Sequence, residues 1–296
     1  MHEFITLNAH YYQQFDADVT RPVPGETYGG WKHAPVQIAP EHTAMVVMHA
    51  WDTGTPQQYP GWWRAVEYMG RAQAILREVF PPLLAAVRRS PLKLYHVVGG
   101  GDYYSSYPGY QRASGLAPPS VAPSPMPSDA AVEALRTFRG KHVGVGEHNE
   151  PDVHRGFANL DFAPQARPHG DEAIAATADQ LAALCRADGV SHLIYVGFAI
   201  DWCLLMSDGG MVDMSRRGAL CSTVRQAVTA VENHQTAAAE LCKQIGLWRV
   251  ALAFGFVFDA DELVRVLDAQ VSAACGARSA SSSADSRTLA TASTVR

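Results

Sequence analysis

The sequence has few lysines and no clustered cysteines. Only four of its 24 basic residues are lysines, so a mechanism that needs a lysine has few positions available. Its five cysteines are spread between positions 185 and 275 without a CxxC pair. This pattern argues against a disulfide framework or a structural zinc site and favours reduced thiols. No stretch approaches about 18 consecutive apolar residues, so no membrane-spanning helix is predicted.

The chain also lacks an excess of positive charge. Its formal net charge of −5 gives no basic field to attract a phosphate backbone, which makes nucleic-acid binding a poor hypothesis. The first residues have no basic stretch followed by an apolar one, as a secretory signal would require. With 47% hydrophobic and 18% charged residues, the composition is that of an ordinary globular protein. Together with the reduced thiols, these features lead us to expect a cytoplasmic protein with no nucleic-acid or membrane partner.

Apolar runs alternate with amphipathic segments along most of the chain. Short runs rich in aliphatic residues predict buried strands at 43–49, 92–98, 192–199 and 219–224. Apolar residues at helical spacing predict helices at 62–79, 128–138, 171–187 and 229–244, with another from about Trp202 and a further apolar run at 247–257. Such alternation implies right-handed crossovers between parallel strands. The predicted fold class is α/β, with three layers (α/β/α) and a mostly parallel central sheet.

Three segments fall outside this alternation. Residues 1–42 are polar and aromatic with scattered Pro and Gly, so we expect an irregular N-terminal arm. Prolines break the pattern at about 99–168, an expected insertion that would serve as a lid or partner surface, or else be mobile. Residues 276–296 consist largely of Ser, Ala and Thr and are expected to be disordered. The rest, 43–275, would form a single domain containing that insertion.

Cys203 is the strongest candidate for a reactive residue. Ligands of doubly wound sheets bind at the carboxyl ends of the strands, and Cys203 follows the strand at 192–199 and opens a helix. Free N–H groups and partial positive charge at a helix start favour a thiolate and can hold an oxyanion. The alternative is a buried thiol that acts as a small apolar side chain. That alternative is preferred for Cys185, Cys221, Cys242 and Cys275.

Histidines and aromatic residues supply further candidates. His49 closes the first strand, and its imidazole can accept a thiol proton, or it is a structural histidine held by hydrogen bonds. A structural role is preferred for His96 and His169. The region after the second strand lacks the additional histidines of a metal site, and Gly99–Gly101 lacks the spacing of a dinucleotide loop. We therefore predict neither a metal nor another cofactor.

Three segments together resemble the isochorismatase-like cysteine hydrolase family. They are TAMVVMHAWD (43–52), VGFAIDWCLL (196–205) and MVDMSRRGALCSTVRQAVTAVEN (211–233), and the likeness extends over about 43–98 and 170–257. The resemblance implies a three-layer α/β fold of Rossmann-like topology that is usually homo-oligomeric. It also implies hydrolysis of C–N amide bonds or, less often, of an enol ether.

Members of this family use an Asp, a Lys and a Cys, with the Asp as general base. By resemblance the nucleophile is Cys203, and the backbone amides of Ala199 and Cys203 hold the oxyanion. A cis peptide bond is expected between Phe198 and Ala199. His49 stands at the position of the family aspartate, which gives an altered catalytic triad.

The family lysine has no counterpart where it is expected, in residues 165–177. That run contains Arg167 and His169, and Lys141 lies some thirty residues earlier. The guanidinium of Arg167 would supply positive charge without acting as an acid. The candidate substrate pocket therefore comprises Trp51, Asp52, His96, Arg167, His169 and Phe198.

Two functions follow from this pattern. The first is a hydrolase in which Cys203 attacks a small amide-type carbonyl and forms a thioester-like acyl-enzyme, with His49 as the base. The second is a catalytically silent relative that keeps the scaffold as a ligand-binding or assembly protein. Two groups of aromatic side chains either wall a substrate pocket or belong to the core or a subunit interface. They are Trp51, Trp62 and Trp63, and Tyr103, Tyr104, Tyr107 and Tyr110.

Overall fold

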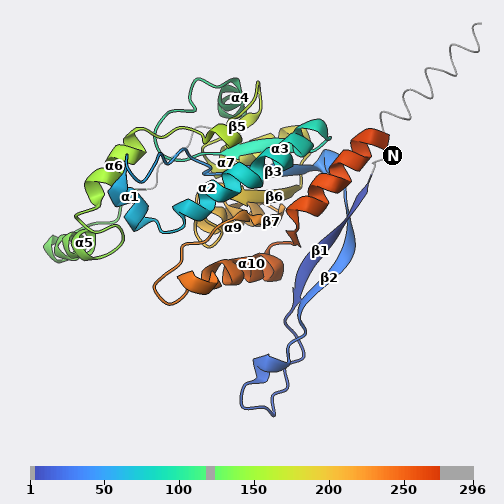
Figure 1. The fold of residues 1–296 in the computed structure, drawn as a ribbon, viewed down its shortest axis with the longest axis horizontal. Helices are drawn as coiled ribbons and strands as arrows, with labels where there is room; N and C mark the ends of the chain where they lie inside the picture. The colour runs from blue at the N-terminus through green and yellow to red at the C-terminus, as the bar shows by residue number, and fades with distance from the viewer. Residues whose placement is uncertain (1–3, 118–123, 274–296) are drawn as a thin grey trace, which may run out of the picture.

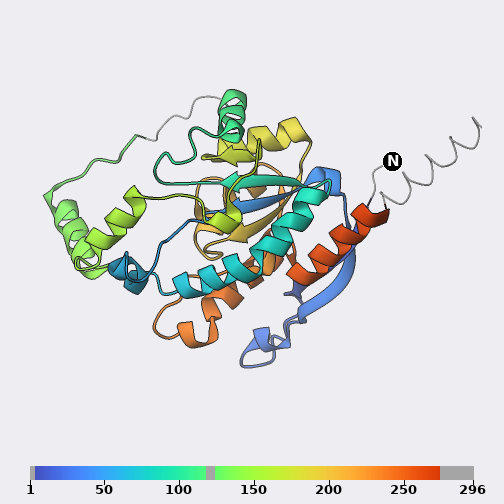
Figure 2. The same cartoon turned by 45° about the horizontal axis from the view of Figure 1, so that its top comes forward.

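A central sheet organises the protein in the computed structural model, which describes residues 4–117 and 124–273 (Figures 1 and 2). Within these residues the sheet has eight strands in the order β2-β1-β8-β7-β6-β3-β4-β5. Neighbouring strands from β8 to β5 run parallel, whereas β1 is antiparallel to both β8 and β2. The strands are β1 (Ile5–Gln13), β2 (Gly30–Ile38), β3 (Thr43–Met48), β4 (Lys93–Val97), β5 (Ala173–Ala175), β6 (His192–Gly197), β7 (Leu220–Val228) and β8 (Val257–Phe258).

Helices cover both faces of this sheet. They are α1 (Pro60–Ala65), α2 (Met69–Glu78), α3 (Phe80–Arg89), α4 (Pro108–Leu116), α5 (Ala130–His142), α6 (Glu150–Ala158), α7 (Ala178–Asp188), α8 (Cys203–Met206), α9 (Met211–Arg216) and α10 (Leu241–Ala253), and residues 260–273 are also helical. None of the helices in the described part of the chain is long and apolar enough to cross a membrane.

The two faces of β3 show how the layers form. Met45 and Val47 belong to a core cluster with residues of α2, α3 and the helix at 260–273. Val46 and Met48 belong to a second cluster, with residues of α7, α9 and α10. Because successive side chains of a strand point to opposite faces, an apolar residue at every position buries the strand on both sides. The predicted three-layer α/β fold is confirmed.

The ends of β3 and β6 bring distant parts of the sequence together. The strands pair in parallel from Thr43 against His192 to Met48 against Gly197. Gly197 has φ +125°, and a Cβ there would lie 1.9 Å from the Met48 carbonyl oxygen, so only glycine permits this approach. As a result, His49 and Phe198 leave the sheet side by side at the same edge.

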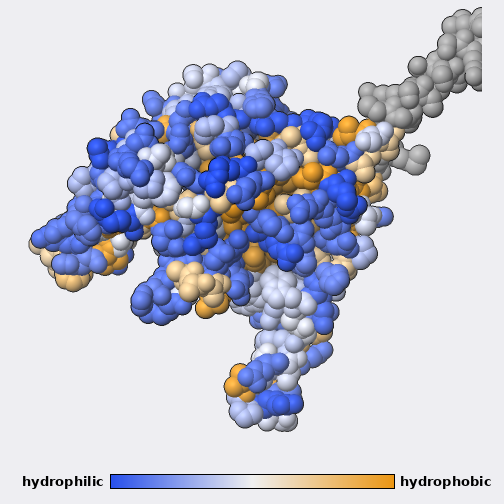
Figure 3. Space-filling view, in the orientation of Figure 1, coloured by the Kyte–Doolittle hydropathy of each residue, from blue (hydrophilic) through white to orange (hydrophobic). Residues whose placement is uncertain are grey.

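The N-terminal segment differs from its prediction. Residues 1–42 were expected to be irregular, but β1 and β2 pair from Ile5 against Ile38 to Gln13 against Gly30. Alternate residues of β1 are buried, as in any strand with one face on a core. Pro35 does not prevent pairing because β2 is an edge strand, where proline is tolerated. The tip of this hairpin projects from the body of the molecule (Figure 3).

Several helices also differ from their predicted bounds. The helix expected at 62–79 is divided into α1 and α2, and α3 includes Pro81–Pro82 in its first turn, where a missing N–H costs no hydrogen bond. The segment 171–187 begins with the short strand β5 before α7. The first apolar residues of this segment belong to an edge strand, and their spacing alone does not distinguish that strand from the start of a helix.

The prediction of a helix at 229–244 was wrong. After β7 the chain is irregular, and α10 begins only at Leu241. Glu232 fixes this start, because its carboxylate accepts the N–H groups of Cys242 and Lys243, both at 3.0 Å. The apolar run at 247–257 belongs mostly to α10, followed by β8.

The segment at 99–168 contains α4, α5 and α6. Helices α1, α5 and α6 lie together at one end of the molecule, beyond the edge of the sheet (Figures 1 and 2). Helix α5 matches the short helix predicted at 128–138, and none of its residues is buried. The segment predicted to be disordered, 276–296, lies outside the described residues, as does Cys275.

Candidate active site

Cys203 is the first residue of α8, directly after the turn that follows β6. Its side chain is half-buried, in contrast to the buried thiols of Cys185 and Cys221. Burial raises the pKa of those two thiols to about 12, which keeps them protonated and unreactive. Because α8 has only four residues, few peptide dipoles are aligned behind Cys203, and the predicted helix field is weaker than expected.

The turn before α8 presents backbone amides. The peptide bond between Phe198 and Ala199 is cis, as the family resemblance predicts. The Ala199 carbonyl accepts N–H groups from Trp202 at 3.3 Å and Leu204 at 3.0 Å, which ties the turn to the helix. Among the described residues, the N–H groups of Ala199 and Cys203 themselves have no hydrogen-bond partner. Both amides are therefore unpaired, and the Ala199 residue is itself fully buried.

A cavity of about 320 Å³, here called the inner cavity, contains both Cys203 and His49 on its wall. Most of the wall is aromatic or aliphatic, and none of the described residues that form it is Asp, Glu, Lys or Arg. The lining residues are His49, Trp51, Thr53, Trp62, Val66, Tyr68, Met69, Ala72, Gln73, Leu76, Val145, Val153, Phe157, Phe198 and Cys203. Two strand ends thus meet side chains from α1, α2 and α6 across a largely apolar space.

His49 is held in an unusual backbone conformation at the end of β3. Its φ is +51°, and its N–H donates to the Val97 carbonyl at 3.1 Å. The ring stacks on Trp51, with centroids 4.7 Å apart and planes 14° apart. Burial lowers the pKa of His49 to about 4, so the imidazole is neutral at neutral pH. Its buried Nδ1 atom has no hydrogen-bond partner within the described structure, which is uncommon. One of the two ring nitrogens of a neutral imidazole has a free lone pair and can accept a proton.

No family model matches the chain. No curated protein matches it either. Similar solved structures include a cysteine hydrolase from Pseudomonas syringae pv. phaseolicola 1448A, with 16% identity, 78% of this chain and 95% of that chain covered, and a TM-score of 0.44.

Two further solved structures are also similar to this chain. An isochorismatase-like hydrolase from Alkaliphilus metalliredigens has 14% identity over 75% of this chain and 96% of that chain, with a TM-score of 0.43. N-carbamoylsarcosine amidase from Thermoplasma acidophilum has 15% identity over 74% of this chain and 97% of that chain, with a TM-score of 0.36. This chain is similar to isochorismatase-family hydrolases of known structure. Their names agree with the family that the motifs resemble.

The basic residues considered as substitutes for the family lysine lie elsewhere. Arg167 donates from Nη2 to Asp161 at 2.5 Å and from Nη1 to the Tyr107 hydroxyl at 3.1 Å. Lys141 is exposed on α5 and pairs with Glu147 at 3.6 Å. Neither of these two cations lines the inner cavity.

The other predicted pocket residues divide between two places. Trp51 and Phe198 line the inner cavity. His96 is buried away from it, with Nε2 3.0 Å from a carboxylate oxygen of Glu172, and the His169 N–H donates to that same oxygen at 3.0 Å. Glu172 also accepts from Arg88 at 2.6 Å, so these residues form a structural network between α3 and the start of β5.

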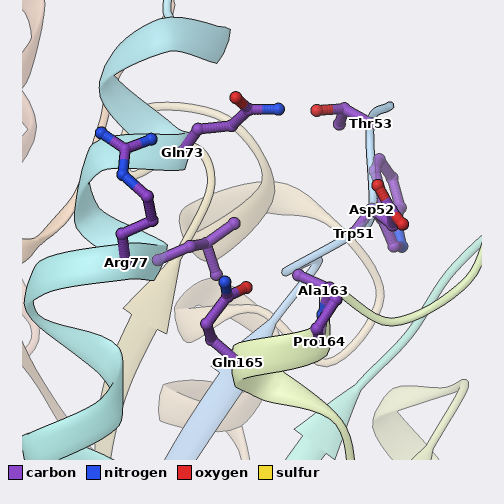
Figure 4. Close-up of a pocket in the computed structure, with 9 residues that line it drawn as sticks. Trp51, Asp52, Thr53, Gln73, Arg77, Ala163, Pro164 and Gln165 are labelled. Atoms are coloured by element: carbon purple, nitrogen blue, oxygen red, sulfur yellow. The ribbon is translucent and has the colours of Figure 1, made fainter. Parts of the chain in front are cut away.

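A second pocket of about 230 Å³, here called the outer cleft, adjoins the inner cavity (Figure 4). The two share Trp51, Thr53, Gln73 and Leu76. The outer cleft alone includes charged side chains, those of Asp52 and Arg77. Figure 4 shows the side chains of Gln73 and Thr53 directed toward each other across the pocket. The cleft is lined by Trp51, Asp52, Thr53, Gln73, Leu76, Arg77, Ala163, Pro164 and Gln165.

Trp62 of α1 was among the aromatic residues expected to wall a pocket or to belong to the core, whereas Tyr68 and the cavity residues of α2 and α6 were not predicted. Tyr68 lines the inner cavity. Burial raises the pKa of its hydroxyl, and the nearby charge of a Cys203 thiolate raises it further. It therefore stays a neutral phenol facing the cavity. Trp62 and Phe157 contact each other with centroids 5.3 Å apart and bring α1 and α6 together. No motif marks such residues, because their roles depend on how three helices pack at one end of the sheet.

Within residues 4–117 and 124–273, no group of three or more His, Cys, Asp or Glu side chains could hold a metal ion. The wall of the inner cavity offers a half-buried thiol, a neutral imidazole, a neutral phenol and the unpaired N–H of Cys203, and the unpaired N–H of Ala199 belongs to the turn just before it. A thiol, a base that can take its proton, and N–H groups that can hold an oxyanion are the elements of nucleophilic acyl transfer.

Proposed function

We propose that this protein is a hydrolase in which Cys203 attacks the carbonyl carbon of a small amide-type substrate. The observation that supports it most is that Cys203 and His49 line one cavity, although 154 positions separate them in the sequence. The free amides of Ala199 and Cys203 beside the thiol add to this support. A nucleophile, a base and a nearby oxyanion donor in one cavity are the arrangement that such a reaction needs.

The reaction would proceed in two stages. His49 takes the thiol proton as the sulfur forms a bond to the carbonyl carbon, and the carbonyl oxygen becomes an oxyanion held by the two amides. The oxyanion then collapses, the C–N bond breaks, and the amine leaves with the proton from His49. Water, deprotonated by His49, attacks the resulting thioester, and the acid product leaves as the thiol is restored.

The low pKa of His49 is compatible with this role. A neutral imidazole has a free lone pair, so His49 needs no prior deprotonation at neutral pH. As the thiolate forms, its negative charge favours the imidazolium across a space of low dielectric constant and raises the pKa of the ring. The stacked Trp51 fixes the ring plane, in place of the orienting carboxylate that the cavity lacks.

A catalytically silent relative is the second candidate function. The observation in its favour is that no charged side chain lines the inner cavity among the described residues, whereas the family that the motifs resemble uses an aspartate and a lysine. Such a protein would bind a ligand in the same cavity without turnover. The homo-oligomeric assembly and the cytoplasmic location stay predictions, supported by the resemblance and by the reduced-thiol pattern.

Selective alkylation of the thiols tests the leading proposal. With iodoacetamide at neutral pH, we expect Cys203 to react faster than Cys185, Cys221 and Cys242, with each site followed by peptide mass spectrometry. His49→Asn should slow the reaction at Cys203 alone. Turnover of an amide panel should vanish in Cys203→Ala and persist in Cys242→Ala, a matched control whose half-buried thiol lies outside the cavity. Equal reactivity of all thiols, without turnover, would favour the silent relative.

A further inference from the structure

The wall of the inner cavity restricts what can surround the reacting carbonyl. Trp51, Trp62 and Phe157 form a connected aromatic group, with centroid distances of 5.7 Å between Trp51 and Phe157 and 5.3 Å between Trp62 and Phe157. Val153 of α6 and Met69 of α2 extend this apolar wall. A substrate attacked by Cys203 must place its carbonyl, and the group bonded to it, against these side chains.

The polar groups of the same cavity carry no formal charge. His49 is neutral because its pKa is about 4, and the phenol of Tyr68 stays protonated because burial raises its pKa. Gln73 and Thr53 are uncharged, and the Gln73 amide donates to the Gly54 carbonyl at 2.9 Å. A charged group that enters the inner cavity loses its water and finds no counterion, which is strongly unfavourable.

Charged side chains line the adjoining outer cleft. Asp52 and Arg77 line the outer cleft and not the inner cavity. Gln73 and Thr53 line both spaces, and their side chains are directed toward each other across the outer cleft (Figure 4). A charged substituent is therefore tolerated on the outer side of this pair and excluded on the inner side.

The volume of the inner cavity sets an upper size. An engineered cavity of roughly 150 Å³ binds a benzene ring. The inner cavity, at about 320 Å³, has room for one ring, the reacting amide and a small substituent. Flat aromatic walls also favour a flat group, because rings stack or pack edge to face with side chains such as Trp51 and Phe157.

We propose that the substrate of this protein is a neutral amide whose scissile carbonyl carries an uncharged aryl or similarly sized branched alkyl group, bound within the inner cavity. The reaction in this inference rests on the proposed function. The preference for an uncharged group rests on the cavity wall alone. The apolar residues of α1, α2 and α6, rather than an ion pair, would then determine which substrate binds.

Ligand binding to Cys203→Ala tests this preference without requiring turnover. Isothermal titration calorimetry would compare benzamide with 4-carboxybenzamide and 4-(aminomethyl)benzamide, which carry opposite charges on the same ring. We expect benzamide to bind and both charged compounds to bind roughly 100-fold more weakly or not at all. Absence of benzamide binding would overturn the proposal, and so would equal binding of either charged compound.

A charge placed in the wall should change this preference. Phe157→Lys puts an ammonium group beside the inner cavity, and the exposed edge of Phe157, at 39% exposure, lets the longer chain be accommodated. We expect this variant to bind 4-carboxybenzamide at least about tenfold better than the parent does. The matched control is Phe138→Lys on α5, outside the cavity, which should leave the preference unchanged.

A second pair of variants provides the same test if Phe157→Lys does not fold. Val153 also lines the cavity, so Val153→Lys is the second cavity variant, and Val132→Lys on α5 is its control. If neither folded cavity variant improves binding of the anion, the wall does not set the preference and the proposal fails.

Turnover separates this inference from the proposed function. If benzamide binds selectively but the wild-type protein hydrolyses none of the neutral amides, the cavity preference stands and the hydrolase proposal fails. If wild-type protein hydrolyses charged and neutral amides equally well through Cys203, the hydrolase proposal stands and the preference fails.

Discussion

The buried imidazole of His49 should make the protein less stable in mild acid. Burial lowers its pKa from 6.5 to about 4 in the folded protein, whereas in the unfolded chain it titrates near its ordinary value. Between these two values the unfolded chain binds a proton that the folded protein does not. Stability is therefore intact above pH 6.5 and is lost as the pH falls toward 4. His49→Asn removes this group, and Asn is a residue that tolerates the positive φ at this position.

The size of the effect follows from the two pKa values. A difference of about 2.5 pK units corresponds to about 3 kcal/mol of unfolding free energy when the pH is well below both values. Between pH 7 and pH 5 the same linkage gives about 2 kcal/mol. We therefore expect the wild-type protein to lose about 2 kcal/mol more than His49→Asn over this interval. The variant is expected to be less stable at pH 7 itself, because the ring no longer stacks on Trp51.

Urea denaturation at pH 7 and pH 5, followed by circular dichroism, measures this difference directly. His192 is a useful comparison, because burial lowers its pKa to about 4 as well, but it lies on β6 with Nε2 2.8 Å from the Ser222 hydroxyl. His192→Asn should show a similar loss of pH dependence without changing the reactivity of Cys203. If the wild-type protein and His49→Asn lose equal stability between the two pH values, His49 is not a buried neutral imidazole. The proposed base would then have to be abandoned.

Three other substitutions test the site and its surroundings. Gly156→Ala would place a Cβ 2.1 Å from Cε3 of Trp62, so we expect a loss of about 1–3 kcal/mol in thermal denaturation and weaker ligand binding. Arg167→Gln should leave kcat/KM within about twofold of wild type, because the guanidinium is bonded to Asp161 outside the inner cavity; a loss above about tenfold would contradict that placement. Cys203→Ala should cost less than about 1 kcal/mol in urea denaturation, since the thiol is half-buried, and a larger loss would indicate a structural role.

The central strands were predictable because burial on both faces requires continuous apolar runs. The predicted strand at 43–49 corresponds to β3, and the one at 192–199 corresponds to β6. Since parallel strands end at the same edge, the prediction that His49 and Cys203 belong to one region follows from the fold class. That prediction depended on no detail of packing, and the two residues do line one cavity.

Features set by tertiary contacts were not predictable in the same way. The pairing of β1 with β2 depends on a partner some 30 residues away, and the alternation of buried residues in β1 is short. The irregular stretch before α10 is fixed by Glu232, whose bonds to two amides no local pattern reveals. Arg167 was a reasonable candidate from the sequence, but a bond to Asp161 directs it away from the inner cavity.

The most direct test of the central claim is to look for the acyl group on Cys203. The protein would be mixed with 4-nitrophenyl benzoate, a neutral aryl ester that fits the proposed cavity preference, quenched in acid, and digested for mass spectrometry. We predict a burst of 4-nitrophenolate and the mass of one benzoyl group on the peptide that contains Cys203, both reduced in His49→Asn and absent in Cys203→Ala. A benzoyl group on another residue only, or an undiminished burst in Cys203→Ala, would contradict the account.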